Sequence, residues 1–135
     1  GRHQEQAQKR KKKNFRLMDE GLSPQERIRK KSDFLALYKK GSRLRGKYFD
    51  IVYLANQLPF SRMAVVVSKR VGNAVVRNKV KRWTRDLFRR NKDLMREPTD
   101  LILIMRKDIV DLSREERKAE YLSAFRRIAR RRPIP

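Results

Sequence analysis

The feature that most constrains the fold is the segment 68–91, which has one apolar and one basic side. It follows an apolar run, 63–67, that predicts a buried strand, and the chain then turns at Gly72-Asn73. A helix from Val76 onward, at about 100° per residue, gathers apolar side chains in one sector: Val76, Val80, Trp83, Leu87 and Leu94. The opposite side carries Asn78, Lys81, Arg82, Arg85, Arg89 and Lys92. One side must therefore pack on a core, while the other faces water or an anion.

The charges on the outer side of this helix indicate whether it faces water or an anion. Like charges on neighbouring helical turns repel, and each such pair costs about 0.2–0.5 kcal/mol. Only Asp86 and Asp93 lie nearby on the helix to offset them. A solvated helix surface is the simpler interpretation, but it usually mixes both signs of charge. The one-sided pattern therefore favours contact with nucleic acid.

The composition supports the same class of partner. The 135 residues suit one domain, and 38 Lys and Arg against 15 Asp and Glu give a net charge of +23. Such an excess predicts phosphate binding that weakens steeply with salt. A basic protein of the membrane surface is the alternative, but no apolar run approaches about 18 residues. The absence of cysteine excludes disulfides, thiolate metal sites and a cysteine nucleophile. With no signal-peptide pattern at the N-terminus, we expect a cytoplasmic protein.

The N-terminal third contains a basic tail and a first helix. Residues 1–23 hold a basic run at 9–13 without apolar periodicity, which predicts a disordered arm, and 24–132 form the single domain. Ser23 and Glu26 have the spacing of a capping box, and Ser32 is predicted to cap the following helix, which ends at Gly41. Phe34 and Tyr38 lie four residues apart and share a face, a pattern that by itself usually indicates core packing.

The rest of the chain alternates strands with two helices. Strands are predicted at 48–54 and 62–68, paired as an antiparallel hairpin, and at 101–105, where five consecutive apolar residues indicate a central strand covered on both faces. Ser113 and Glu116 form a capping box before a last helix. Its apolar stripe is Tyr121, Leu122, Phe125 and Ile128. The expected fold is α+β, a small α/β sandwich with the element order α-β-β-(β)-α-β-α.

Catalytic chemistry is difficult to build from these residues. The only histidine, His3, lies in the predicted arm, so no nucleophile–histidine pair is available. Asp50, Asp100 and Asp108 could in principle converge on Mg²⁺, but no spacing motif links them. Gly41 and Gly72 are isolated and do not form a phosphate-binding loop. The polypeptide alone is therefore predicted to be inactive, with no catalytic residue and no metal site of its own.

Residues 69–82, KRVGNAVVRNKVKR, resemble the hallmark of the protein subunit of bacterial ribonuclease P, K-x-V-G-N-A-V-x-R-N-R-x-K-R. Arg85 matches a further arginine that follows this motif. Residues 28–34 look like the R-L-K-K-x-x-D-F segment of the family, and 99–106 match its last apolar strand. The resemblance covers about residues 24–130. Lys79 departs from it, since it stands where the family usually has arginine and cannot form a two-pronged contact.

The resemblance implies the protein subunit of an endoribonuclease that removes the 5′ leader from precursor tRNA. In that family a large RNA is the catalyst and holds most of the Mg²⁺, and the partners are that RNA and precursor tRNA, with no protein partner. The βαβ crossover of the family fold is left-handed, against the general rule. The matching positions imply these contacts with the catalytic RNA: Lys69, Arg70, Asn73, Arg77, Asn78, Lys79, Lys81, Arg82, Arg85 and Arg89.

The family also binds the single-stranded leader between the first helix and the sheet. The resemblance matches two aromatic residues of the first helix, Phe34 and Tyr38, and the cleft-facing strand positions Tyr48, Asp50, Val52 and Val66. Stacking on aromatic rings tolerates any base, which suits leaders of many sequences. Val52 stands where an aromatic residue is often seen, and we expect Tyr53 to point to the other face. The alternatives are a ribosomal or other structural RNA-binding protein, and a nuclease that needs no RNA subunit.

Overall fold

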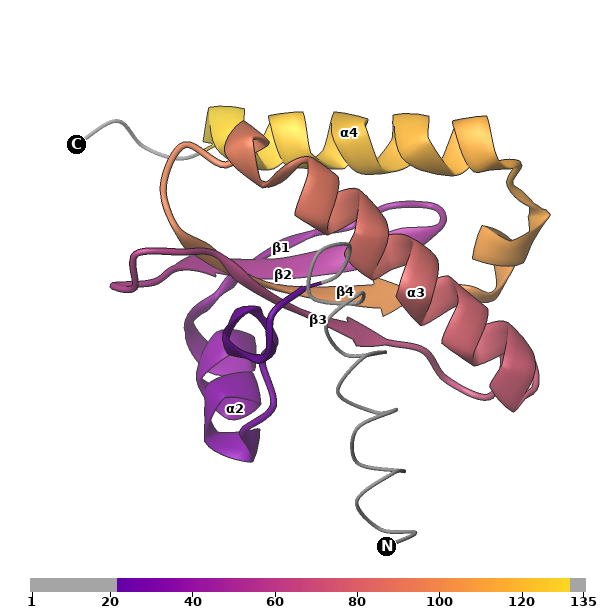
Figure 1. The fold of residues 1–135 in the computed structure, drawn as a ribbon, viewed down its shortest axis with the longest axis horizontal. Helices are drawn as coiled ribbons and strands as arrows, with labels where there is room; N and C mark the ends of the chain where they lie inside the picture. The colour runs from indigo at the N-terminus through magenta and orange to yellow at the C-terminus, as the bar shows by residue number, and fades with distance from the viewer. Residues whose placement is uncertain (1–21, 132–135) are drawn as a thin grey trace, which may run out of the picture.

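The computed structural model describes residues 22–131, in which a four-stranded sheet lies between helices (Figure 1). The helices are α2 (Lys31–Lys40), α3 (Ala74–Arg90) and α4 (Arg114–Arg131), with short 3₁₀ turns η1 (Pro24–Glu26), η2 (Lys92–Leu94) and η3 (Lys107–Asp111). The strands are β1 (Ser42–Leu44), β2 (Phe49–Ala55), β3 (Arg62–Val66) and β4 (Thr99–Met105). Helices α3 and α4 cover one face of the sheet and α2 lies on the other. The predicted α+β sandwich is confirmed.

Strand β4 occupies the middle of the sheet, as its apolar sequence predicted. The strand order is β1-β2-β4-β3, with β4 antiparallel to β2 and parallel to β3. The predicted hairpin between β2 and β3 is therefore wrong, because β4 lies between them. The continuous apolar run of β4 is buried on both faces and needs neighbours on both edges. Strand β3, α3 and β4 form a parallel βαβ unit, and the handedness of this crossover stays a prediction.

Alternate residues of the strands build two separate cores. Ile51, Tyr53 and Leu103 point toward α3 and α4, where the ring of Tyr121 stacks on Phe49 with the ring centroids 4.7 Å apart. On the opposite face a smaller cluster lies under α2: Ile28, Leu37, Val52 and Ile102. Tyr53 and Val52 thus face opposite sides of the sheet, which confirms the predicted register.

Helix α3 packs through a broader stripe than the sequence suggested. Val80 is fully buried, and Val76, Trp83 and Leu87 are half-buried against the larger core. The centre of the contact is formed by Thr84 and Phe88, which the apolar sector omitted. Thr84 is accommodated because its Oγ1 lies 2.7 Å from both the Val80 carbonyl oxygen and the Tyr121 hydroxyl. The helix ends at Arg90, so Leu94 reaches the core from η2.

The ends of the other helices test the capping predictions. At α4, the Ser113 amide donates to Glu116 Oε1 at 2.9 Å and the Glu116 amide donates to Ser113 Oγ at 3.2 Å, so this capping box is confirmed. The predicted cap at Ser32 is wrong, because α2 begins at Lys31 and no side chain caps it. Gly41 does end α2, and a Cβ there would lie 2.6 Å from the Leu37 carbonyl oxygen. The predicted arm lies outside the described residues, apart from its end, where Leu22 is buried in the larger core.

Candidate RNA-binding surfaces

The residues before α3 fix where this helix starts. Val71 is buried, and its amide donates to the Ser68 carbonyl oxygen at 3.1 Å. A Cβ at Gly72 would lie only 2.8 Å from Val76 Cγ1, so glycine allows the close approach of this turn to the helix. The Asn73 side chain caps the helix by accepting a hydrogen bond from the Val76 amide at 3.0 Å. The V-G-N part of the motif is therefore structural, with Asn73 already engaged by the backbone.

The cations of the motif and Asn78 lie on α3 and in the segment just before it, and we call this set the α3 basic surface. It consists of Lys69, Arg70, Arg77, Asn78, Lys79, Lys81, Arg82 and Arg85. The side chains of Asn78, Lys79 and Arg82 are exposed, and those of Arg77 and Arg85 are half-buried. Within residues 22–131, no cation of this surface forms an ion pair with a carboxylate. The predicted docking side is thus available to an outside anion.

Two other cations predicted on the same side are engaged within the protein. Arg89 Nη2 lies 3.0 Å from Asp86 Oδ1, and Arg90 Nε lies 3.1 Å from Asp86 Oδ2. Lys92 Nζ lies 2.6 Å from Glu26 Oε2, which ties η2 to η1. Arg89, which the resemblance assigns to RNA, therefore brings a partly neutralised charge to the surface.

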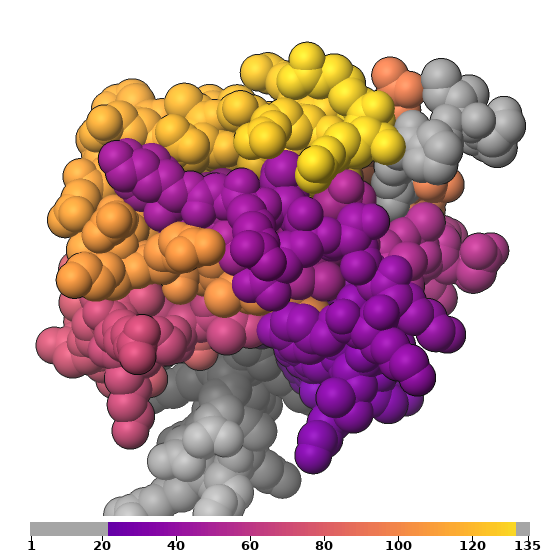
Figure 2. Space-filling view, turned by 180° about the vertical axis from the view of Figure 1, so that it is seen from behind, coloured from indigo at the N-terminus to yellow at the C-terminus, as the bar shows by residue number. Residues whose placement is uncertain are grey.

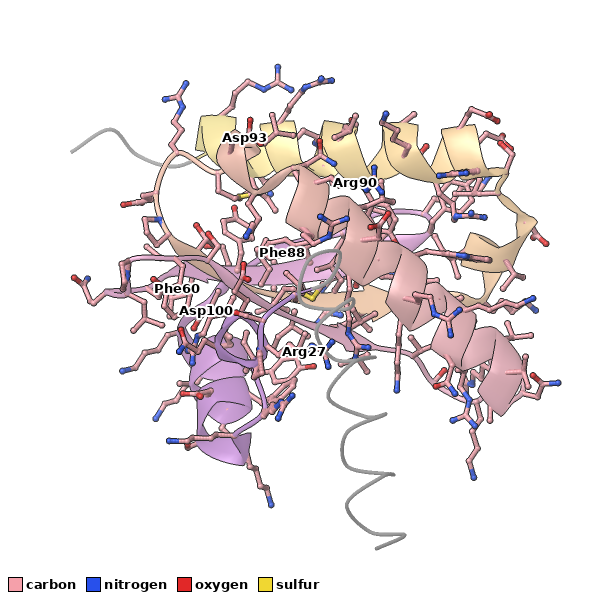
Figure 3. The ribbon with its side chains drawn as sticks, in the orientation of Figure 1. Arg27, Phe60, Phe88, Arg90, Asp93 and Asp100 are labelled. Atoms are coloured by element: carbon pink, nitrogen blue, oxygen red, sulfur yellow. The ribbon has the colours of Figure 1, made fainter. Side chains whose placement is uncertain are left out.

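Arg85 lies in a cluster of arginines that sequence reasoning missed. Burial lowers the pKa of the Arg85 guanidinium, and the neighbouring charges of Arg27 and Arg29 lower this pKa further. Arg27 lines the same groove as Lys81 and Arg85, and Figure 3 shows it on the side of α3 that faces α2. Arg27 and Arg29 come from the extended segment before α2, where Arg27 bridges to Met63 at the outer edge of β3. Only this long-range pairing brings them to α3, so spacing in the sequence gave no signal.

Several guanidinium nitrogens of this region are buried without a hydrogen bond. They are the Nε atoms of Arg27, Arg77 and Arg89. A buried N–H that has lost water without gaining an acceptor costs about 1–3 kcal/mol, and more for a charged group. Arranged in this way, the groups have the donors and the charge that a phosphate diester requires.

The second predicted surface lies on the α2 side of the sheet, and we call it the α2 surface. Phe34 and Val66 are half-buried around the small core, together with Ala64, Leu54 and Ile104. Tyr38 is 46% exposed on the same helix. In the view from behind, α2 forms a ridge at the lower right, apart from the pink segment around the end of β3 (Figure 2). Exposed and half-buried apolar groups on a helix and a neighbouring sheet suit the stacking of bases.

The structure brings together only part of the predicted leader set. Phe34, Val52 and Val66 belong to one cluster, although Val52 is only 3% exposed and lies at its base. Tyr48 differs, since it packs against the larger core that faces α3 and α4. It precedes the first residue of β2, so the alternation that would place it beside Asp50 does not hold there. Its contact with a leader stays a prediction.

Ion pairs hold both ends of the α2 surface. At one end Arg62 forms an ion pair with Asp100, with Arg62 Nη2 2.6 Å from Asp100 Oδ2. Arg62 Nη1 also lies 3.5 Å from Oδ2 of Asp33, which belongs to α2. At the other end Asp50 accepts from Arg43 at 2.8 Å and Arg106 at 2.9 Å. Burial alone would raise the pKa of Asp50, but the hydrogen bonds from these two arginines lower it below its ordinary value.

Two of the three acidic residues considered for a metal site, Asp50 and Asp100, are bound by arginines of the protein. Asp50 is paired with Ile104 in the sheet register and Asp100 with Leu54, so the two carboxylates lie toward opposite ends of β4. Figure 3 shows Asp100 beside Phe60, next to the top of α2. Asp108 lies in η3. Within residues 22–131 these acids form no cluster of three potential metal ligands.

Comparison with known proteins decides the family. The model of the family described as Ribonuclease P matches residues 22–129. The chain belongs to the ribonuclease P protein family. It is 40% identical over 92 residues to the ribonuclease P protein component of Thermotoga maritima, covering 68% of this chain and 79% of that protein. For Bacillus velezensis the identity is 37% over 108 residues, with 78% and 91% covered.

Solved structures of ribonuclease P proteins agree with the fold. The protein from Thermotoga maritima aligns with a TM-score of 0.69 and 34% identity, covering 76% of this chain and 96% of that one. A Staphylococcus aureus ribonuclease P protein mutant with defective mRNA degradation activity aligns with a TM-score of 0.73 and 31% identity, covering 87% and 96%. Membership of this ribonuclease P family implies 5′ processing of tRNA together with the RNA subunit. Among the described residues, no helix is long and apolar enough to cross a membrane.

Proposed function

We propose that this ribonuclease P protein binds the catalytic RNA through the α3 basic surface and the 5′ leader of precursor tRNA on the α2 surface. In doing so it promotes endonucleolytic removal of the leader by the RNA. The protein is not itself the catalyst, and the Mg²⁺ ions of the reaction are held mainly by the RNA. Its partners in this role are the catalytic RNA and precursor tRNA, and its place of action is the cytoplasm.

Binding of the catalytic RNA to the α3 basic surface is supported by a difference between two groups of arginines, those with and those without a carboxylate partner. Arg62, Arg43 and Arg106 are matched by Asp100 and Asp50 in the folded protein. The cations of the α3 basic surface have no such partner within residues 22–131, although Arg85 is half-buried beside Arg27 and Arg29. Crowding like charges without a counterion destabilises the free protein. An RNA phosphate backbone would remove that cost, which supports binding there.

Binding of the leader is supported by the make-up of the α2 surface. Stacking of a base on an aromatic ring is worth about 1–3 kcal/mol and requires no particular sequence. Phe34 is held in place by the small core, whereas Tyr38 is exposed for contact on the next turn. A fixed ring loses little conformational freedom when a base stacks on it. A leader held in this way adds binding energy to the precursor that the mature tRNA lacks.

The path of the chain connects the two surfaces. The segment 27–29 lies beside Arg85 and leads directly into α2, which begins at Lys31. Arg62 then joins α2 to the sheet through Asp33 and Asp100. Catalytic RNA docked on α3 and a leader docked near α2 would therefore contact neighbouring parts of the chain that these ion pairs join to the sheet. This supports a positional role, in which the protein keeps the leader in a fixed relation to the RNA active site.

The deciding experiment is reconstitution with the catalytic RNA of a bacterial ribonuclease P at low Mg²⁺, with and without the protein. We expect the protein to increase cleavage of precursor tRNA. Arg82→Ala, which removes an exposed and unpaired cation, should weaken binding of the catalytic RNA and flatten its log–log salt dependence by about one unit. Arg130→Ala, an equal loss of charge at the exposed end of α4, is the matched control.

Other outcomes would overturn the proposal in distinguishable ways. Copurification with ribosomal particles, without stimulation of cleavage, would indicate a structural RNA-binding protein. Cleavage by the RNA-free protein in Mg²⁺ would indicate a nuclease in its own right. Equal salt dependence for the Arg82→Ala and unmodified proteins would remove the assignment of the α3 basic surface.

A further inference from the structure

The groove that Arg27, Lys81 and Arg85 line extends over α3 to its other flank, and we call the part between this helix and the first half of α4 the α3–α4 groove. Its lining includes Trp83, Leu87 and Arg90 from α3 and Arg114, Arg117 and Lys118 from α4. Arg27 and the labelled Arg90 lie on opposite flanks of the helix in Figure 3, and Arg90 is next to α4. The family motif includes none of these six residues. The α3–α4 groove thus adds six residues that the resemblance did not assign, next to positions such as Arg82 that it did assign.

The centre of this groove is a cation held on the face of an aromatic ring. The guanidinium carbon of Arg117 lies 3.7 Å from the centroid of the Trp83 ring. Arg117 Nη1 also donates to the Leu112 carbonyl oxygen at 3.1 Å, which fixes one edge of the group. The apolar sector of α3 assigned Trp83 to the core, yet the ring is only half-buried and supports Arg117 from below. A guanidinium fixed at one edge and one face presents its remaining N–H donors outward.

The charges around this pair are almost entirely positive. Arg114 and Lys118 are exposed and lie four residues apart, so they occupy neighbouring turns on one side of α4. Within residues 22–131, neither they nor Arg117 form an ion pair. The carboxylate among the described lining residues is Asp86, which Arg89 and Arg90 already bind. The groove thus combines a fixed guanidinium with flexible cations and has little internal compensation.

We propose that the α3–α4 groove binds a second stretch of the sugar–phosphate backbone of the catalytic RNA, with the stacked Trp83–Arg117 pair at its centre. This inference rests on the proposed function of the α3 basic surface. The groove is continuous with that surface, because Arg82 and Asn78 line the same depression. The α2 surface, where the leader is proposed to bind, lies on the other face of the sheet from α3 and α4. One RNA molecule would therefore contact both flanks of α3, and the helix would lie between two stretches of the RNA backbone.

Trp83 provides a direct test, since it is the only tryptophan in the chain. Its fluorescence is measured in the full-length protein, free and bound to the catalytic RNA, with acrylamide as a neutral quencher. We expect the RNA to lower quenching by acrylamide and to change the emission of Trp83. Equal quenching in the free and bound protein would show that the groove stays open to solvent and would overturn the inference.

A charge-matched pair of double variants gives an independent test. Arg114→Gln with Lys118→Gln should flatten the salt dependence of catalytic-RNA binding by about two units, one for each lost phosphate contact. Arg130→Gln with Arg131→Gln removes the same charge from the far end of α4 and should change the slope less. Equal flattening by both pairs would reveal a general charge effect and overturn the groove assignment.

The same titrations separate this inference from the function on which it rests. If Arg82→Ala flattens the salt dependence and the Arg114/Lys118 variant does not, the α3–α4 groove is not an RNA site, while the α3 basic surface stands. If neither variant changes the slope, both assignments fail. The five altered positions, Arg82, Arg114, Lys118, Arg130 and Arg131, are all exposed, and far-ultraviolet circular dichroism checks that each variant is folded.

Discussion

Replacing Arg85 by methionine should stabilise the free protein while it weakens RNA binding. The substitution keeps an unbranched apolar side chain that can fill the half-buried position, and it removes a charge that burial and the neighbours Arg27 and Arg29 disfavour. Each repulsive pair near a protein surface costs about 0.2–0.5 kcal/mol. Removing two such pairs should raise the free energy of unfolding by about 0.4–1 kcal/mol.

Urea denaturation measures this effect. The midpoint should rise for Arg85→Met while the slope of the transition stays constant, since the exposed area does not change. The gain should shrink at high salt, where the repulsion is screened. Arg82→Met is the matched control, because Arg82 is exposed on the same helix and its loss should change stability by less than about 0.5 kcal/mol.

RNA binding should respond differently in the same two variants. Both should flatten the salt dependence of catalytic-RNA binding by about one unit, because each loses one cation from the α3 basic surface. The combination of higher stability and weaker binding distinguishes a functional cation from a structural one. If Arg85→Met were less stable than the unmodified protein, the side chain would be contributing to the fold, and the argument from uncompensated charge would fail.

Three further changes test other parts of the structure. Phe34→Ala should raise the KM for leader-bearing precursor by about five-fold or more, the equivalent of 1–3 kcal/mol of lost stacking, and leave binding of mature tRNA unchanged; an equal effect on both RNAs would contradict a leader contact. Arg62→Met leaves the buried Asp100 without its bidentate partner and should cost about 3 kcal/mol in thermal unfolding, whereas a near-neutral result would show that α2 docks without this clamp. Burial raises the pKa of Tyr121 to about 12, so the neutral phenol stabilises the fold below the ordinary pKa near 10, and this contribution is lost as the pH rises toward 12. Tyr121→Phe should therefore lose less stability than the unmodified protein between these pH values; parallel curves would refute the assignment.

The strongest local patterns predicted the elements well, and long-range pairing explains most of the errors. The amphipathic pattern of α3 and the five apolar residues of β4 identified the basic helix and the central strand. The expected β2–β3 hairpin was wrong because a short connection does not force neighbouring strands to pair when a third strand fits between them. Thr84 was missing from the predicted contact because its hydroxyl is satisfied by Val80 and Tyr121, which no helical wheel can show.

In the candidate site, too, residues close together in the sequence were predicted, whereas those brought together by long-range contacts were missed. Motif residues close together in the sequence, such as Lys81, Arg82 and Arg85, line one groove on α3, and their contact with RNA stays a prediction. Arg27 and Arg29 were missed because a bridge between Arg27 and Met63 brings a distant segment to α3. Trp83 was counted only as an apolar residue, although its ring serves both the core and a guanidinium. Side chains with an apolar body and a second interaction are the hardest to assign from pattern alone.

The central position of β4 has a consequence for folding during synthesis. Both β2 and β3 pair with β4, which is the last of the four strands to be translated. Until residues 99–105 leave the ribosome, neither β2 nor β3 can form its main pairing, and the apolar sides of both strands lack most of their cover. Strands β1 and β2 can pair early, but the sheet is completed late, from contacts that are distant in sequence. The arginine-rich helix α3 leaves the ribosome before β4, the strand that completes the sheet on which it packs.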